Sequence, residues 1–167
     1  MAVRAASLLG LTYSGTPSAC CIGLKVNEIM RREGLFSRPA NIGRYLNERL
    51  DGLARRHEMI GEVRGKGLLF GIELVADRKS RAPFDRSLEV ARQVVDRMRA
   101  RNIIITAGIS SGGFGGDQLQ ISPPFIISEA EIDELVGALD EVLGEVARWL
   151  PGQPRLATRR SISPGTP

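Results

Sequence analysis

The sequence contains few lysine, histidine, cysteine and aromatic residues. Its 167 residues include one histidine, two cysteines and 5% aromatic residues, and its lysines are Lys25, Lys66 and Lys79. Zinc sites need three or four spaced cysteine, histidine or carboxylate ligands, which one histidine and two adjacent cysteines do not supply. We therefore predict no metal site. A reaction that requires a lysine amine has only these lysines as candidates.

Long hydrophobic runs and paired cysteines are also missing. Cys20 and Cys21 are neighbours in sequence, where a mutual disulfide would be strained, so reduced thiols typical of a cytosolic protein are predicted. No apolar run approaches the ~18 residues of a membrane-spanning helix, and residues 1–11 match a signal peptide poorly. These absences predict a cytoplasmic location and no membrane association.

The positive charge of the chain is scattered. The formal net charge is +4 at pH 7, from 23 lysines and arginines against 19 acidic residues. A nucleic-acid-binding surface typically shows clustered basic residues with interleaved aromatic residues or a known binding module. Neither pattern occurs, so no nucleic-acid partner is predicted.

The length allows one compact domain with a real core, and is too short for an enzyme with a large and a small domain. Residues 1–10 show no periodicity and are expected to be an unstructured start. Residues 151–167 are rich in proline, glycine, serine and arginine, and are expected to be a disordered tail. Between these ends, 11–34 predicts a loop and a long helix, and 35–150 predicts the folded domain.

Helix and strand patterns alternate along this domain. Helices are expected from Pro17 to about Gly34, at 38–57, at 87–101, and from a capping box at Ser128 to Leu150. Strands are expected at 62–64, 68–75, 102–106 and 118–121, with a turn at 65–67 and a glycine-rich loop at 107–117. The predicted fold class is α+β, with a sheet of three or four strands and helices packed on one face.

The segment before the first helix can bind a phosphate group. The hydroxyls of Thr12 and Ser14 and the amides at the start of the Pro17 helix are suitable donors. The same residues commonly form an ordinary turn and helix cap. The residues alone leave both interpretations open.

Four segments resemble the class III (omega) aminotransferases, in the order and spacing of that family. They are TYSGTPSAC at 12–20, which resembles the family's TYSGHP-x-(A/C)-C-A; EGL with GRYL at 33–46; GEVRGKGLLFGIELV at 61–75; and ISPPFIISEAEID at 121–133. The resemblance covers residues 11–148. On these motifs the chain is identified as a member of the family.

The resemblance implies the small C-terminal domain of a fold type I enzyme that uses pyridoxal 5'-phosphate, preceded by a long interdomain helix. It implies that Thr12 contacts the phosphate of a cofactor held by the neighbouring subunit, and that Tyr13, Ser14 and Gly15 shape this loop. The implied partners are a second copy in a homodimer or the missing large domain. Small-molecule amines and keto acids or aldehydes would be the substrates of the intact enzyme.

No catalytic residue is assigned to this chain by the resemblance. In the family, the lysine that carries the cofactor precedes the first motif, and none of the lysines here matches it. We therefore expect a C-terminal fragment that is inactive alone, from a split enzyme or a reading frame that begins within a longer one. The alternative is a non-catalytic α+β domain that associates with a partner subunit, because loss of the large domain would expose apolar surface.

Two departures from the family concern the site. Thr16 replaces the usual histidine before the proline. No arginine occurs between Arg101 and Arg148, although several members bind the substrate carboxylate through an arginine before the Pro-Pro motif. We therefore expect this chain not to use that mode of carboxylate binding.

The remaining polar and glycine residues are expected to be structural. His57 is predicted to be a solvated or capping residue at the end of the second helix. The last helix is predicted to carry an exposed acidic face, formed by Asp133, Glu134, Asp140, Glu141 and Glu145. Tight turns and close packing are predicted at Gly65, Gly67 and Gly71.

Overall fold

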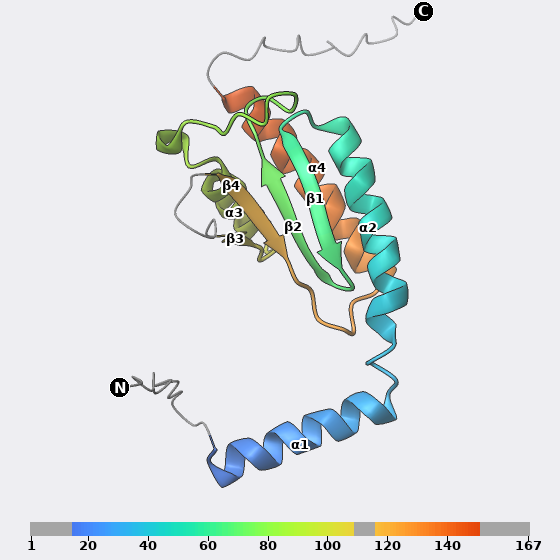
Figure 1. Ribbon diagram of the computed structural model, residues 1–167. Coiled ribbons are helices and arrows are strands. Elements are labelled where there is room, and N and C mark those ends of the chain that lie inside the picture. Colours follow the sequence, from blue (N-terminus) through green and yellow to red (C-terminus); the bar gives the residue numbers. More distant parts are fainter. Residues whose placement is uncertain (1–14, 109–115, 151–167) are drawn as a thin grey trace, which may run out of the picture. The chain divides into compact units, whose positions relative to one another are not determined.

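The computed structural model describes residues 15–108 and 116–150 (Figure 1). The chain forms two compact units, Met1–Arg38 and Pro39–Pro167, which are considered separately. The expectations for residues 1–10 and 151–167, and for most of the glycine-rich loop, lie outside the described residues.

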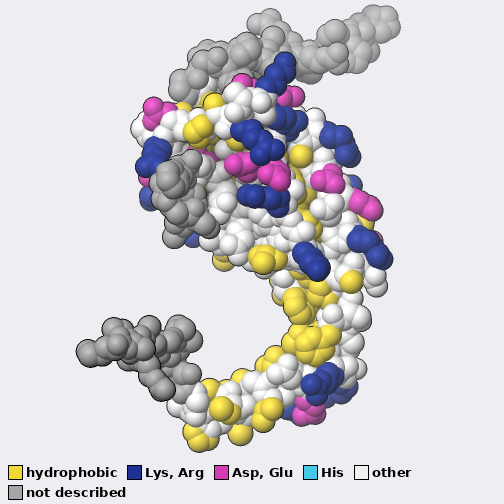
Figure 2. Space-filling view, viewed as in Figure 1, with side chains coloured by type: hydrophobic (Ala, Val, Ile, Leu, Met, Phe, Trp, Pro, Cys, Tyr) yellow, Lys and Arg dark blue, Asp and Glu magenta, His cyan; other side chains and the backbone are white. Residues whose placement is uncertain are grey.

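The first unit contains one helix, α1 (Pro17–Arg32), among its described residues. Proline at the first position loses only an amide that has no partner within a helix, so Pro17 suits the start. Gly34 has a φ of +65°, which a glycine adopts without strain and which ends the helix as predicted. No residue of α1 is buried, and Figure 2 shows hydrophobic side chains along its surface.

The second unit is built on a four-stranded antiparallel sheet in the order β1-β2-β4-β3. Its strands are β1 (Ile60–Lys66), β2 (Leu69–Leu74), β3 (Thr106–Gly108) and β4 (Asp117–Ile121). Its α-helices are α2 (Arg38–Arg56), α3 (Val90–Ala100) and α4 (Glu129–Trp149), which lie on one face of the sheet (Figure 1). The predicted fold class is confirmed.

Buried and more exposed side chains alternate along β2, and the buried ones mark the face of the sheet that the helices cover. Phe70, Ile72 and Leu74 are 3%, 0% and 1% exposed, and they pack against the helices. Leu69, at the start of the strand, is 57% exposed. Glu62, Arg64 and Lys66 of β1 are partly or fully exposed, and Figure 2 shows acidic and basic side chains over the sheet. This is the pattern of an antiparallel sheet with one face packed and one face open.

The capping box predicted for the last helix is present. Ser128 Oγ accepts a hydrogen bond from the Glu131 backbone amide at 3.2 Å, and the Glu131 carboxylate accepts one from the Ser128 amide at 2.8 Å. These bonds give the first turn of α4 partners for amides that helix geometry leaves unpaired. Six residues of α4 are buried against the sheet and the other helices: Ile132, Val136, Leu139, Val142, Leu143 and Val146.

The predicted boundaries of one strand and one helix were wrong. The strand expected at 102–106 begins only at Thr106, and the ladder with β4 ends at the pair Thr106 and Gln120. The helix expected at 87–101 is a 3-10 turn, η1 (Arg86–Leu88), followed by α3. Glu89 separates them with a φ of +44°, which breaks the helical geometry.

The β1–β2 hairpin packs closely against α2. Lys66 pairs with Leu69, so the turn is Gly67–Leu68 and not the predicted 65–67. A Cβ added at Gly43 of α2 would lie 2.1 Å from the Gly67 carbonyl oxygen. The glycine at position 43 therefore allows the helix backbone to approach the turn.

Candidate functional site

The loop predicted to contact phosphate lies mainly outside the described residues. Of Thr12, Tyr13, Ser14 and Gly15, the structure describes Gly15 alone, which is exposed in a turn with a φ of +76°. The phosphate contact proposed for these four residues therefore stays a prediction.

The start of α1 is compatible with an anion. Pro17 opens the helix directly after this loop, and the first turn holds no acidic residue. A helix N-terminus carries a partial positive charge and free amides, which favour a phosphate group. The start of α1 is thus compatible with a phosphate group, and the roles of Thr12 and Ser14 stay predictions from the sequence.

The lysines do not form a cofactor-bearing site in the part of the chain that is described. Lys25 is on α1, with its Nζ 2.8 Å from Glu28 Oε1 and a side chain 59% exposed. Lys66 is exposed at the end of β1, and Lys79 is exposed in a turn whose amide donates to Asp77. An exposed lysine remains hydrated, whereas a lysine that forms a Schiff base is typically desolvated in a pocket.

The strands before and after the glycine-rich loop carry no basic side chain. Thr106 of β3 pairs with Gln120 of β4, and both are exposed. No arginine is available on either strand in the described residues, consistent with the absence of arginine between Arg101 and Arg148. Nothing on these two strands supplies a cation for a carboxylate.

His57 is more buried than predicted. Its side chain is 13% exposed, and its Nε2 lies 2.5 Å from Asp140 Oδ1 of α4. Arg56 Nη2 lies 2.9 Å from the other carboxylate oxygen of Asp140. Burial raises the pKa of Asp140, but hydrogen bonds from His57 and Arg56 outweigh it and hold this pKa below its ordinary value. Of the two predicted roles, solvated or capping, the contact with Asp140 speaks against full solvation, and it could not be predicted because Asp140 is distant in sequence.

Other acids of the last helix also tie helices together. Tyr45 Oη of α2 donates to Asp133 at 2.8 Å, and this hydrogen bond raises the pKa of Tyr45. Arg101, just after α3, donates to Glu145 at 2.6 Å. Sequence reasoning found the acidic face of α4 but missed these contacts. The spacing of arginines and acids within one helix gives no signal for pairs between helices.

Arg78 anchors the loop that follows β2. Its guanidinium donates to the carbonyl oxygens of His57 at 2.7 Å and Ile60 at 2.8 Å, and also to that of Ala54. These carbonyls belong to the last turn of α2 and the chain after it, which need partners. The role of Arg78 was not predicted.

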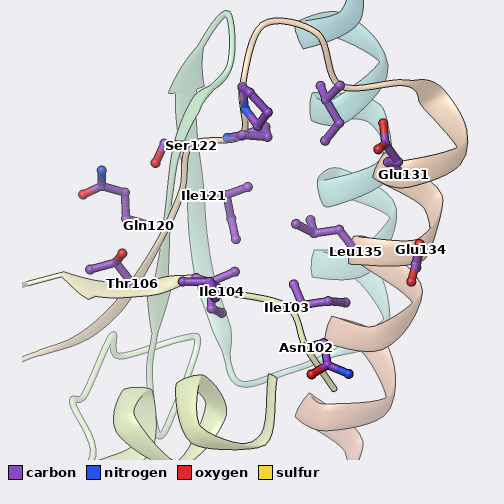
Figure 3. Close-up of a pocket in the computed structure, with 14 residues that line it drawn as sticks. Asn102, Ile103, Ile104, Thr106, Gln120, Ile121, Ser122, Glu131, Glu134 and Leu135 are labelled. Carbon is purple, nitrogen blue, oxygen red and sulfur yellow. The ribbon is translucent and has the colours of Figure 1, made fainter. Parts of the chain in front are cut away.

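A cavity of about 440 Å³ opens between residues 102–106, the end of β4 and the first turns of α4 (Figure 3). Ile121 of β4 and Leu135 of α4 point toward each other across it. Among the residues that the structure describes, no group of three histidine, cysteine, aspartate or glutamate residues could hold a metal ion. The helices in the same residues include none that is long and apolar enough to cross a membrane.

This fold matches transaminase structures of the pyridoxal phosphate fold type I. A transaminase from a study of directed evolution by ancestral reconstruction superposes with a TM-score of 0.75 at 37% identity, covering 84% of this chain and 30% of that chain. The PMP-bound form of an aminotransferase from Vibrio fluvialis superposes with a TM-score of 0.71 at 33% identity, covering 82% and 28%. The class defined by the architecture is therefore the small-domain part of such enzymes.

Sequence comparison gives the family. The model of "Aminotransferase class-III" matches residues 1–143, so the chain belongs to the class III aminotransferases. It is 38% identical over 144 residues to the uncharacterized aminotransferase YodT of Bacillus subtilis, covering 84% of this chain and 32% of that protein. The chain spans about a third of the length of the curated relatives that it matches.

Proposed function

We propose that this chain is the C-terminal part of an aminotransferase dependent on pyridoxal phosphate, and that it works only together with a large domain. The complete enzyme would transfer an amino group from an amine or amino acid to a keto acid or aldehyde. The observation that carries this proposal is the family match over residues 1–143, together with the absence of a suitable lysine among Lys25, Lys66 and Lys79.

Thr12 and Ser14 would hold the cofactor phosphate, with the amides at the start of α1 as additional donors. When bound, the cofactor supplies an electron sink that makes amino transfer possible. The residues of this chain would contribute binding and orientation, and Gly15, with a φ of +76°, permits a turn directly before the helix. In this proposal the cofactor belongs to the neighbouring subunit of a homodimer, and the enzyme is cytoplasmic.

The uncharged side chains of Thr106 and Gln120 concern how a substrate carboxylate could be bound. Neither carries charge, and the family's carboxylate-binding arginine has no counterpart between Arg101 and Arg148. We propose that the donor or acceptor is held without that arginine, which favours substrates that carry no carboxylate at this position.

Inactivity of the isolated chain can be tested directly. Purified chain would be incubated with pyridoxal phosphate, reduced with borohydride and analysed by intact mass and peptide mapping. We expect no stoichiometric, site-specific lysine adduct and no amino transfer to pyruvate. A full-length class III aminotransferase serves as the positive control, and a single modified lysine accompanied by turnover would refute the proposal.

A chimera tests the positive part of the proposal. Residues 11–148 would replace the corresponding region of the Vibrio fluvialis enzyme, whose chain is matched in this region. We expect a folded enzyme that binds the cofactor, with Thr12→Ala weakening cofactor affinity about tenfold through loss of one charge-assisted hydrogen bond. Thr16→Ala is the matched control and should leave affinity within about twofold. Equal effects of the two substitutions would contradict the assignment of Thr12.

The apolar surface of α1 favours a second candidate function. Ile22, Leu24 and Val26 are 65%, 72% and 48% exposed, so the helix presents apolar surface without buried contacts. A non-catalytic domain that associates with a partner subunit through α1 would explain this surface. Light scattering with size exclusion would decide: a strictly monomeric chain over a wide concentration range, with no partner-dependent complex, would count against it.

A further inference from the structure

The cavity between β4 and α4 follows from the backbone around it. The β3–β4 ladder ends at the pair Thr106 and Gln120. Beyond it, residues 102–105 have no strand pairing with β4, and Asn102, which follows α3, has a φ of +61°. A space of about 440 Å³ lies among this unpaired segment, residues 120–124 and the first turns of α4. This volume lies within the range of small-molecule sites.

The lining of this cavity is apolar inside and polar at its border. Ile103, Ile121, Ile127 and Leu135 provide aliphatic surface. Ile104, which also lines it, is 81% exposed, so a large aliphatic side chain stands in solvent beside the opening. Neutral polar residues complete the border: Asn102, Thr106, Gln120 and Ser122. A ligand with an apolar body would bury surface that is now hydrated.

The charges at the cavity are all of one sign. Among the described residues that line it, Glu131 and Glu134 are the charged ones, although the whole chain carries a net charge of +4. They lie three positions apart on α4, so their side chains share one side of the helix. Hydrogen bonds from the Ser128 amide and hydroxyl lower the pKa of Glu131, so this carboxylate remains an anion at neutral pH.

Glu134 differs from Glu131 in having no partner. No hydrogen bond or ion pair engages its carboxylate within residues 15–108 and 116–150, whereas other acids of α4, including Asp133, Asp140 and Glu145, pair with cations of neighbouring elements. A carboxylate beside an apolar cavity is suited to a cation carried on an apolar body. Inorganic anions and carboxylates would be repelled, and two carboxylates are too few for a metal site.

We propose that this cavity binds a small organic ammonium ion with a short aliphatic or aromatic body. The body would occupy the aliphatic interior, and the ammonium group would donate hydrogen bonds to Glu134, with Glu131 adding negative potential. The site is formed by this chain alone, and the inference does not depend on the proposed amino transfer.

The test uses the full 167-residue chain without cofactor and n-pentylammonium chloride as the probe. Amide chemical shifts would be followed by NMR at constant ionic strength, with sodium pentanoate as the probe of equal length and opposite charge. We expect saturable shifts concentrated at residues 102–106, 120–122 and 131–135, with a dissociation constant on the order of 1 mM. Pentanoate should bind at least about tenfold more weakly, and added salt should weaken the ammonium probe.

Matched variants separate charge from packing. Glu134→Gln should weaken binding about threefold to fivefold, as expected for an exposed ion pair. Glu141→Gln removes the same charge from the same helix outside the cavity, and should change the constant by less than about 1.5-fold. Ile104→Ser should weaken binding without affecting the fold, because Ile104 is 81% exposed. Thermal melts confirm that each variant is folded.

Several outcomes would overturn the proposal. They are equal binding of pentanoate, equal effects of Glu134→Gln and Glu141→Gln, shifts centred on another surface, and no saturation up to about 50 mM, which lies far above the expected constant. Shifts confined to the cavity together with charge discrimination would establish the site.

Discussion

The helices α1 and α4 have similar sequence patterns but differ in how much of their apolar side is buried. Both are amphipathic, yet α4 buries six of its 21 residues and α1 buries none of its 16. An isolated helix of this length is marginal in water, and most helical stability in proteins comes from packing. The apolar side of α4 is buried against the sheet and the other helices of its unit. The apolar side of α1 stays exposed in the described residues.

Matched leucine substitutions test this difference and should give the largest effect. Leu139 of α4 is 0% exposed and Leu24 of α1 is 72% exposed. Leu139→Ala should lower the free energy of unfolding by about 3 kcal/mol, through lost burial and a cavity. Leu24→Ala should change it by less than about 0.5 kcal/mol. Urea denaturation followed by circular dichroism measures both, and a large loss for Leu24→Ala would mean that α1 is covered in solution.

Glycine substitutions on α2 and α4 compare a helix position in close backbone contact with one in open space. A Cβ at Gly43 would meet the Gly67 carbonyl oxygen at 2.1 Å, whereas one at Gly137 of α4 would meet nothing within 4 Å. Gly43→Ala should destabilise by about 2 kcal/mol, because the hairpin turn must move away from α2. Gly137→Ala should stabilise by about 0.5 kcal/mol through better helix propensity. Losses of similar size in both variants would remove the argument for a close approach at Gly43.

Arg78 tests whether the end of α2 depends on side-chain donors. Arg78→Ala removes hydrogen bonds to three carbonyl groups, at Ala54, His57 and Ile60, and should lower the free energy of unfolding by about 1.5 kcal/mol. Arg81 is exposed and lies 4.0 Å from Glu62, so Arg81→Ala should have an effect below about 0.5 kcal/mol. Thermal melts at neutral pH compare the two, and equal shifts would refute the anchoring role.

The pair between α2 and α4 predicts a small effect that depends on pH. The folded chain holds the pKa of Asp140 below its ordinary value of 3.8, so its stabilisation is fully present above that value. It is lost as the pH falls through the lowered folded value. Asp140→Asn should cost about 1 kcal/mol at pH 7, allowing for solvent screening. The gap between variant and parent should close below about pH 4, and a constant gap from pH 7 to pH 3 would contradict this assignment.

Local sequence signals predicted most of the fold. The capping box at Ser128 and the three- and four-residue spacing of apolar residues located α4 and its buried face. Short β-branched and apolar runs located β2 and β4. These signals work because each depends on neighbours along the chain, as does the proline at the start of α1.

Contacts between distant segments were the part that could not be predicted. The pairing of His57 with Asp140 and the anchoring by Arg78 join residues far apart in sequence. The strand expected at 102–106 was too long, because its β-branched residues give no signal of where pairing with β4 ends. For the site, the motif resemblance predicted the phosphate loop, while the cavity beside Glu134 depends on three separate segments and has no local signature.

The strand order has a consequence for the way this domain assembles. The strands β1 and β2 are joined by a two-residue turn. By contrast, Leu74 of β2 pairs with Asp117 of β4, and η1, α3 and β3 lie between these two residues in the sequence. Loop closure over such a distance is entropically costly and slow. Since β4 is the only strand that pairs with β3 in the described sheet, β3 cannot join before β4 has docked. Within the second unit, the cavity wall at residues 102–106 is thus expected to form after the β1–β2 hairpin and to exchange its amide hydrogens sooner than that hairpin.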